Sequence, residues 1–309
     1  MTRIVLPSKL GASDLLAVMA KARGADTPIE IDFKHLRHVT PVFLAALTAT
    51  VHHWEKTGRP VVFSGLEHCQ ITSYLQRMDF LKRCGIDLPE NFARHKPQGR
   101  FLPITEVEVR VEDLAREIAE CFAPGGDDYE HPNAGFYDFL VYAVTELGNN
   151  IRQHSSGTGF TAVQASPTDG MVRLALADNG VGILRSFQRI EAPWSKNATD
   201  SEAILKAMEP RVSCKMGVPN EGVGLTILSS VIGKMKGWLM VASGTGLVIS
   251  SGGSAPAPRN FPNEGYYQGT LVALTIRRTA AASFSEHLKT TKFDKGLLPM
   301  AKPRATFES

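Results

Sequence analysis

Two short motifs, one after the other in the sequence, carry the residue types best suited to chemistry. The first, Glu146–Asn150, reads Glu-Leu-Gly-Asn-Asn and lies inside a helical pattern. Glu146 and Asn150 are four residues apart and therefore project from the same face of a helix, with His154 one turn further on. A carboxylate can orient or deprotonate a nucleophile, and an amide oxygen is a hard ligand that Mg²⁺ accepts beside phosphate oxygens and water. A solvated helix face is the alternative that this helix alone leaves open.

The second motif, residues 178–182, reads Asp-Asn-Gly-Val-Gly and follows a strand pattern. Asp178, at the end of that strand, can accept a hydrogen bond from the exocyclic amine of adenine, which guanine lacks at that position. Gly180 and Gly182 have no side chains that would block a base or a sugar. Taken alone, the same residues also fit an ordinary turn, because Asp-Asn-Gly is common between strands.

Two further glycine motifs lie downstream. Gly222-Val223-Gly224 precedes an apolar helical segment, Leu225–Lys236, and free N–H groups at a helix start suit phosphate oxygens. Gly269-Thr270 precedes the last predicted strand, where Thr270 could share a water molecule with Asp178 beneath the base. Each of these motifs is weak evidence by itself. The order of all four is hard to produce by chance and indicates a nucleotide pocket.

With these four motifs the chain resembles the GHKL ATP-binding superfamily, which includes gyrase, the large heat-shock chaperones, histidine kinases, MutL and the anti-sigma serine kinases. The resemblance covers about Ile104 to Arg278. It implies ATP and Mg²⁺ as cofactors, with Glu146 as the catalytic carboxylate, Asn150 as the Mg²⁺ ligand and Asp178 as the residue that reads adenine. It also implies nucleotide contacts by the other motif residues, which are Gly180, Gly182, Gly222, Gly224 and Thr270.

The segment between the glycine motifs, Ile183–Glu221, corresponds to the ATP lid of that superfamily. It is long, polar and charged, so we expect it to bury little apolar surface and to be mobile without ligand. Its six lysines and arginines include candidates for a contact with the terminal phosphate. Lys215 is the preferred one because it lies close before the second glycine motif. For the others, solvated lid charges are the alternative.

The residues before the motifs, 1–90, alternate strand and helix patterns and predict a small α/β domain. The expected strands are Arg3–Leu6, Ile29–Phe33 and Pro60–Ser64, and the expected helices are Ser13–Arg23, Val42–Lys56 and Ile71–Cys84. This pattern is weakly similar to a STAS domain, the fold of anti-sigma-factor antagonists. In that family a serine before the central helix accepts phosphate, and here Thr40 is the only hydroxyl near that place. Whether Thr40 is phosphorylated stays open, and a docking or oligomerisation module is the favoured role.

A polar, proline-bearing linker is expected at 91–103, followed by the ATP-binding domain at 104–280 and a flexible tail at 281–309. The expected strands of the ATP-binding domain are Glu106–Val111, Thr161–Ala165, Met171–Ala177 and Leu271–Ile276, with helices at Glu112–Phe122 and Gly135–His154 and a hairpin region at Gly244–Gly265. The predicted fold class is therefore α/β (α+β). The two resemblances imply a GHKL (Bergerat-type) sandwich of helices on a mixed sheet, preceded by a smaller STAS-like domain.

Composition limits the partners and the compartment. Hydrophobic residues make up 43% of the 309 residues and charged residues 21%, which suits globular domains with real cores. The net charge of +3 argues against a broad basic surface for nucleic acid. We expect no membrane segment, since the longest apolar run is too short to span a bilayer. The four scattered cysteines are expected to be reduced thiols in a cytoplasmic protein.

Of three functions for the predicted ATP site, a relic of a histidine kinase is the least favoured, because no helical hairpin with a phospho-acceptor histidine precedes the ATP domain. Two functions remain open. The first is an anti-sigma type protein serine/threonine kinase in bacterial-style signalling, in which Glu146 deprotonates a hydroxyl of a protein partner. The second is an ATPase or nucleotide-gated switch that binds partners through lid closure without phosphorylating them. Either function predicts a protein partner, bound through the STAS-like domain or the lid, and a homodimer is possible.

Overall fold

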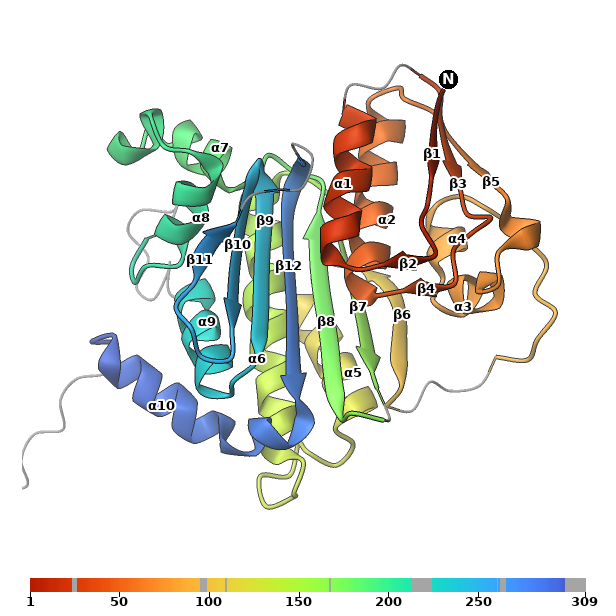
Figure 1. Cartoon of the computed structure of the whole chain (residues 1–309). Coiled ribbons are helices and arrows are strands. Elements are labelled where there is room, and N and C mark those ends of the chain that lie inside the picture. Colours follow the sequence, from red (N-terminus) through yellow and green to blue (C-terminus); the bar gives the residue numbers. More distant parts are fainter. Residues whose placement is uncertain are drawn as a thin grey trace, which may run out of the picture.

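The computed structural model describes residues 1–23, 27–94, 99–108, 110–166, 168–212, 224–259, 261 and 265–297. The chain is a mixed α/β protein, as the sequence predicts, with a three-stranded and a seven-stranded sheet among its described residues (Figure 1). Within those ranges, no helix is both long enough and apolar enough to span a membrane.

The N-terminal unit is built on the parallel three-stranded sheet, in the order β1-β3-β5. The other short elements surround this sheet, and β2 pairs with β4 as a separate two-stranded sheet. The elements are β1 (Thr2–Val5), β2 (Lys9–Leu10), α1 (Ala12–Arg23), β3 (Ile29–Asp32), β4 (His38–Val39), α2 (Pro41–Lys56), β5 (Val61–Ser64), α3 (Thr72–Arg77) and α4 (Phe80–Arg83).

The predicted helix Ile71–Cys84 is wrong in one respect, because the structure divides it into α3 and α4. Asp79 separates them and has a positive φ of 55°, which cannot continue a right-handed helix and which aspartate tolerates better than most residues. The turn redirects the chain so that Phe80 and Leu81 become buried. The Asp79 carboxylate pairs with Arg94 at 2.8 Å.

The seven-stranded sheet has the order β11-β10-β9-β12-β8-β7-β6. Its strands are β6 (Phe101–Glu106), β7 (Gly159–Ala165), β8 (Met171–Asp178), β9 (Trp238–Gly244), β10 (Gly246–Ser251), β11 (Ala257–Arg259) and β12 (Tyr267–Arg277). The expectation of a mixed sheet is wrong, since all six pairs of neighbouring strands are antiparallel. Between β6 and β7 the chain passes through two helices, α5 (Val111–Phe122) and α6 (Ala134–Asn150), and so returns to the end at which it left the sheet.

The first strand of this sheet lies earlier than predicted. The expected strand Glu106–Val111 is replaced by β6, which takes residues 101–103 from the predicted linker 91–103. Val111 instead begins α5, where it is fully buried against Gly148 of α6. The predicted strand Glu106–Val111 is therefore divided in the structure: its first residue ends β6, and its last residue begins α5.

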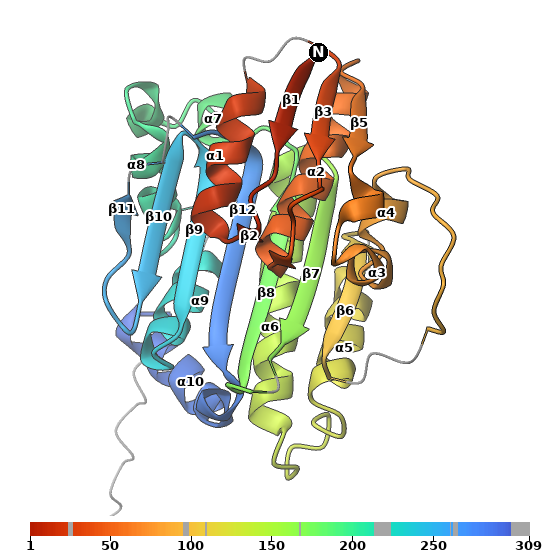
Figure 2. The same ribbon diagram turned by 45° about the vertical axis from the view of Figure 1, so that its right-hand side comes forward.

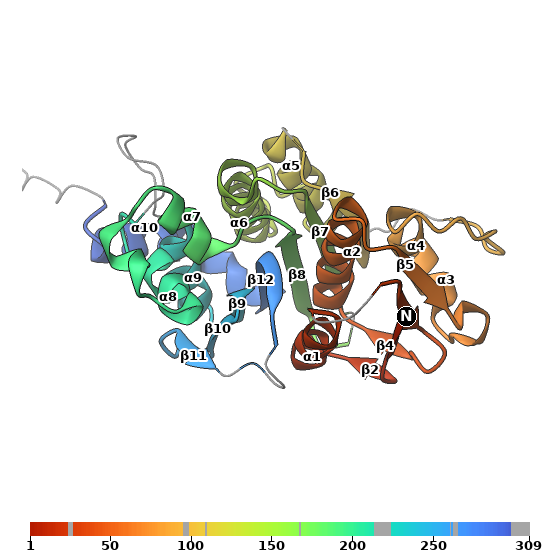
Figure 3. The ribbon, with the colours of Figure 1, turned by 90° about the horizontal axis from the view of Figure 1, so that it is seen from above.

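Opposite faces of the seven-stranded sheet belong to two different cores. Along β8, Ala175 and Ala177 face the N-terminal unit, whereas Leu174 and Leu176 face α5, α6 and α9 (Gly224–Lys234). Figures 2 and 3 show the resulting order of layers, in which α1 and α2 lie between the small sheet and the large one. The alternation follows from the two-residue period of a strand.

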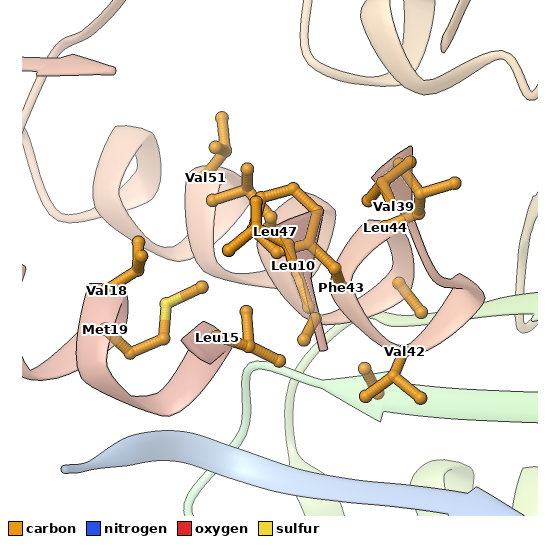
Figure 4. Close-up of a cluster of buried hydrophobic side chains, with 14 of the residues drawn as sticks. Leu10, Leu15, Val18, Met19, Val39, Val42, Phe43, Leu44, Leu47 and Val51 are labelled. Atoms are coloured by element: carbon orange, nitrogen blue, oxygen red, sulfur yellow. The ribbon is translucent and has the colours of Figure 1, made fainter. Parts of the chain in front are cut away.

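Helix α2 is buried around its circumference because both sheets cover it, and its buried Thr48 and Thr50 hydroxyls donate to the carbonyls of Leu44 and Ala46. Residues 41–51 are all buried, and Val42 points from α2 toward a neighbouring strand in Figure 4. The sheet face opposite α2 is lined largely by alanine, which lets the helix backbone approach closely. These fully buried alanines are Ala162, Ala175, Ala177, Ala242 and Ala273.

The expectation of a flexible tail from Ala281 is wrong as far as Asp294. A short 3₁₀ segment, Arg278–Ser283, leads into α10 (Phe284–Asp294), and Phe284 packs edge-on against Phe139 with ring centroids 5.7 Å apart. Phe284 and Thr291 are the buried residues of α10, so its apolar periodicity is weak. The sequence pattern therefore did not indicate this helix. Residues 298–309 of the predicted tail lie outside the described residues.

Candidate functional site

A pocket of about 250 Å³ lies between α6, the ends of β8 and β12, and the start of α9. Residues from all four sequence motifs line it, although the motifs are far apart in the chain. The predicted site residues in its wall are Glu146, Asn150, Asp178, Gly182, Gly224 and Thr270. Gly180 lies next to the pocket and is hydrogen-bonded to Asp178, and Lys215 and Gly222 lie outside the described residues.

Asp178 ends β8 and is only 2% exposed. Its Oδ1 accepts a hydrogen bond of 2.8 Å from the backbone N–H of Gly180, and the backbone and hydroxyl of Thr270 also donate to it. Burial outweighs these bonds and raises the pKa of the Asp178 carboxyl to about 7. The Asp178 carboxyl is therefore a hydrogen-bond acceptor that is buried from solvent at the base of the pocket.

This raised pKa predicts a pH-dependent cost in stability. Between pH 3.8 and about 7 the folded protein keeps a proton on Asp178 that the unfolded chain has lost, so stability falls as pH rises through that window. The difference between the two pKa values corresponds to about 4 kcal/mol. We expect Asp178→Asn to be more stable than the parent at pH 8, with a much smaller difference near pH 4, in urea unfolding. An equal difference at both pH values would mean that the carboxyl has an ordinary pKa.

The loop after Asp178 is held tightly on its neighbours. Asn179 accepts from the backbone N–H of Thr158 at 2.8 Å, and the N–H of Val181 donates to the carbonyl of Ser155 at 2.9 Å. A side chain at Gly180 would collide with the Ser155 backbone. At Gly269 the φ of 94° and the closeness of Asp178 exclude a side chain as well. The glycines thus allow the close approach of β12 and η2 (Ile151–Ser155) to Asp178.

Glu146 and Asn150 lie in the last turns of α6 and face the pocket, while Phe139, Leu140 and Leu147 face the core. The predicted helix Gly135–His154 changes character at its end, because η2 is one turn of π-helix. Such turns concentrate at functional sites, and this one brings Gln153, His154 and Ser155 into the pocket wall. Burial raises the pKa of the Glu146 carboxyl, and the charge of Lys292 on α10 opposes that shift.

Gly224 places the start of α9 directly against Glu146. A methyl group at Gly224 would lie 2.9 Å from the carboxyl carbon of Glu146 and would collide with its Oε2. The backbone N–H groups at a helix start carry partial positive charge and attract anions. The Glu146 carboxyl therefore lies against the first residue of α9 in this structure.

The predicted lid, Ile183–Glu221, is structured over its described part, contrary to the expectation that it buries little apolar surface. It contains α7 (Ile183–Arg189), a 3₁₀ turn at Pro193–Lys196 and α8 (Asp200–Ala207). Phe187 and Ile204 are buried, and α8 begins with a complete capping box between Thr199 and Glu202. Asp200 binds the β9–β10 turn through the N–H and hydroxyl of Thr245, both at 2.8 Å. Residues 213–221 lie outside the described residues.

Several pocket residues escaped the sequence prediction because no motif marks them. They come from η2, the lid helices and α9, and they are Gln153, Ser155, Ile183, Ser186, Phe187, Ala207, Val212 and Leu225. An apolar residue or a serine carries no chemical signal of its own until neighbouring elements are placed around it.

Comparison of the sequence with models of known protein families finds no match, and a search of curated proteins also finds none. The described residues contain no cluster of three His, Cys, Asp or Glu side chains that could hold a metal ion. The function must be inferred from the arrangement of the pocket itself.

Proposed function

We propose that this protein binds ATP with Mg²⁺ in the pocket between α6, β8, β12 and α9. The observation that carries the proposal is the convergence of Glu146, Asn150, Asp178, Gly224 and Thr270, from four separate elements, on one cavity. A structural role for any one of these residues would not require the others to face the same space. Their chemistry divides into an adenine end and a phosphate end.

The adenine end is Asp178 with Thr270. A buried carboxylate that already accepts from Gly180 at 2.8 Å has a remaining lone pair for the exocyclic amine of adenine. Guanine would present a carbonyl oxygen there, and two acceptors would face each other without a donor between them. The apolar wall formed by Leu176, Ile183 and Val272 suits a planar base.

The phosphate end is the start of α9 with Asn150. The helix N-terminus at Gly224 offers N–H groups to anions, and Asn150 offers an amide oxygen to Mg²⁺. When bound, Mg²⁺ neutralises phosphate charge and orients the phosphates. Glu146 lies between these groups, so its carboxylate is placed to accept a proton from a nucleophile at the terminal phosphate.

This arrangement supports a GHKL-type architecture for the region from β6 to β12, with helices on one face of the large sheet. In the same proposal, the parallel sheet β1-β3-β5 with its helices is a STAS-like unit. That unit packs through α2 on the face of the large sheet opposite α5, α6 and α9. The STAS-like unit therefore packs directly on the proposed ATP-binding domain, and the large sheet separates it from the pocket.

We propose that the reaction is phosphoryl transfer from ATP to a serine or threonine of a protein partner. Thr40 of the same molecule is not that acceptor, because α2 and the pocket lie on opposite faces of the large sheet. Transfer to water, with the lid as a nucleotide-gated switch, is the second candidate. Phosphate release without partner phosphorylation would select the second.

Calorimetry with ATP and GTP, with and without Mg²⁺, tests nucleotide binding directly at pH 8, where Asp178 is ionised. We expect ATP to bind and GTP to bind at least about tenfold more weakly, since an unpaired buried acceptor costs about 1–3 kcal/mol. Asn150→Ala should remove the part of the ATP affinity that depends on Mg²⁺, because the metal loses its protein ligand. Asn133→Ala, at the other end of α6, serves as the control. Equal affinities for ATP and GTP would overturn the proposal.

Trapping the protein in its ATP-bound state should identify the protein partner. A Glu146→Gln variant loaded with ATP keeps the nucleotide without turnover and is the best bait for a protein partner. Labelled ATP then shows whether the captured protein receives phosphate. Sedimentation with and without ATP reports whether a homodimer forms.

A further inference from the structure

One buried hydroxyl outside the pocket wall joins two segments that enclose the proposed adenine end. Ser243 lies near the end of β9, is 1% exposed and is not among the residues that line the pocket. Its Oγ accepts a hydrogen bond of 2.9 Å from the backbone N–H of Ile183 and donates one of 2.8 Å to the carbonyl of Gly269. This single side chain therefore links β9 to the start of α7 and to β12.

The Gly269 carbonyl belongs to a bulge in β12. Thr270 of β12 pairs with Ser243 of β9, whereas Gln268 and Gly269 have no counterpart on β9. A bulge takes backbone groups out of the regular ladder of hydrogen bonds and increases the local twist of the strand. The Ser243 hydroxyl supplies a partner for the Gly269 carbonyl, so it holds the bulge on β9.

The bulge lies directly against the carboxyl group that we assign to adenine. A methyl group at Gly269 would lie 2.7 Å from Oδ1 of Asp178 and would collide with the Asp178 carbonyl. Thr270, the next residue, lines the pocket together with Asp178. Bulges beside functional sites commonly direct a side chain. A shift of this bulge would therefore move Thr270 relative to Asp178.

The other bond of Ser243 fixes the apolar wall of the same end of the pocket. Gly182, with a φ of 81°, brings the backbone so close that a methyl group there would lie 2.8 Å from the Ser243 hydroxyl oxygen. Ile183 follows, begins α7 and contributes to the wall proposed for the base. Ser243 therefore holds a polar side of the adenine end, at Gly269 and Thr270, and an apolar side, at Ile183.

Ser250, on the neighbouring strand β10, shows what a local role looks like in this protein. Its side chain is also buried, at 3% exposed, and its hydroxyl donates to the carbonyl of Ser254 at 2.9 Å, four residues away in the chain. The partners of Ser243 are instead 60 and 26 residues away, and they lie in or next to the pocket wall. The bonds of Ser243 thus join distant segments at the site, which the bond of Ser250 does not.

We propose that Ser243 is a positioning residue of the adenine end, whose hydroxyl holds the β12 bulge and the start of α7 in place beside the base. The inference rests on the proposed ATP binding and deepens it by adding a residue that no sequence motif marks. Ser243 makes no contact with the nucleotide itself. Its loss should therefore weaken binding of the base and the preference for adenine over guanine, and should leave the contribution of the phosphates unchanged.

Calorimetry with ATP, adenosine and GTP at pH 8 tests the proposal. Ser243→Ala should weaken the affinities for ATP and adenosine by the same factor, roughly tenfold, since two buried backbone groups lose their partner. It should also reduce the preference for ATP over GTP. In an Asp178→Asn background, the loss of ATP affinity caused by Ser243→Ala should be clearly smaller, because the two residues serve the same end of the pocket.

Ser250→Ala is the matched control, since it removes a buried hydroxyl-to-carbonyl bond of similar length from an adjacent strand. It should bind ATP, adenosine and GTP like the parent. Thermal unfolding of both alanine variants shows whether each is folded at the temperature of the titration. If Ser243→Ala is not folded there, Ser243→Cys takes its place, because a thiol keeps the shape of the side chain but is a weak donor and acceptor.

The outcomes separate the possible failures. A parent protein that does not bind ATP overturns the proposed function, and this inference with it. A parent that binds ATP, beside a folded Ser243 variant that behaves like Ser250→Ala, overturns only the inference. A loss for ATP that is larger than the loss for adenosine also overturns it, because Ser243 would then act on the phosphate end. An equal loss with and without the Asp178→Asn substitution overturns it as well, by showing that Ser243 acts independently of the adenine contact.

Discussion

A Glu146→Gln variant should bind ATP at least as tightly as the parent and turn it over about 10²–10⁴-fold more slowly. Glutamine keeps the shape of the side chain but cannot take a proton. In the structure the Glu146 carboxyl lines the pocket, and burial raises its pKa, as is common for groups that accept protons in catalysis. Steady-state release of phosphate gives the turnover, and calorimetry gives the affinity.

The matched control is Asp138→Asn, which removes an exposed carboxylate from the same helix two turns before Glu146. It should turn ATP over at the rate of the parent. If Glu146→Gln does so too, Glu146 is not the base, and another carboxylate has to serve the reaction. A variant that loses both turnover and affinity would instead place Glu146 among the groups that bind the ligand.

An Asp178→Asn variant should lose roughly tenfold or more in ATP affinity at pH 8, because a hydrogen bond to a charged group contributes about 1.5–3 kcal/mol. The amide also brings a donor to a position where the adenine amine needs an acceptor. Its Oδ1 can still accept from Gly180, so the loop after β8 keeps its hydrogen bond. Calorimetry with ATP measures the loss.

Unfolding cannot explain that loss, because the same substitution should stabilise the empty protein at pH 8. Asp169→Asn is the control, since Asp169 is a carboxylate in the turn at the other end of β8, where it binds Met171 and Arg173. It should leave ATP affinity unchanged. An Asp178→Asn variant with the parent's affinity for ATP would remove the adenine contact from the proposal.

Local patterns predicted most of the elements that carry the site. The helical pattern of Gly135–His154 indicated α6, and the four-residue spacing of Glu146 and Asn150 placed both on one face of it. The sequence also predicted strands at Thr161–Ala165 and Met171–Ala177, which correspond to β7 and β8. The glycine before Thr270 lies at the bulge near the start of the last strand. These features depend on neighbours within a few residues, so the sequence itself contains the information.

Long-range packing decided what the patterns could not. The division of Ile71–Cys84 into two helices occurs at Asp79, and the order of the seven-stranded sheet depends on pairing between strands that are far apart in the chain. The docking of α2 on an alanine-lined sheet face is equally invisible in any single segment. Each of these features arises where surfaces distant in the chain meet.

The chain by itself determined which residue types are available for nucleotide chemistry and on which kinds of element they lie, because both follow from composition and local spacing. Only the tertiary structure decided that Asp178 is buried from solvent and that Glu146 lies against Gly224. The physical reason is that burial and charge interactions depend on distances between side chains. Those distances are set when the whole core packs, and no local pattern encodes them.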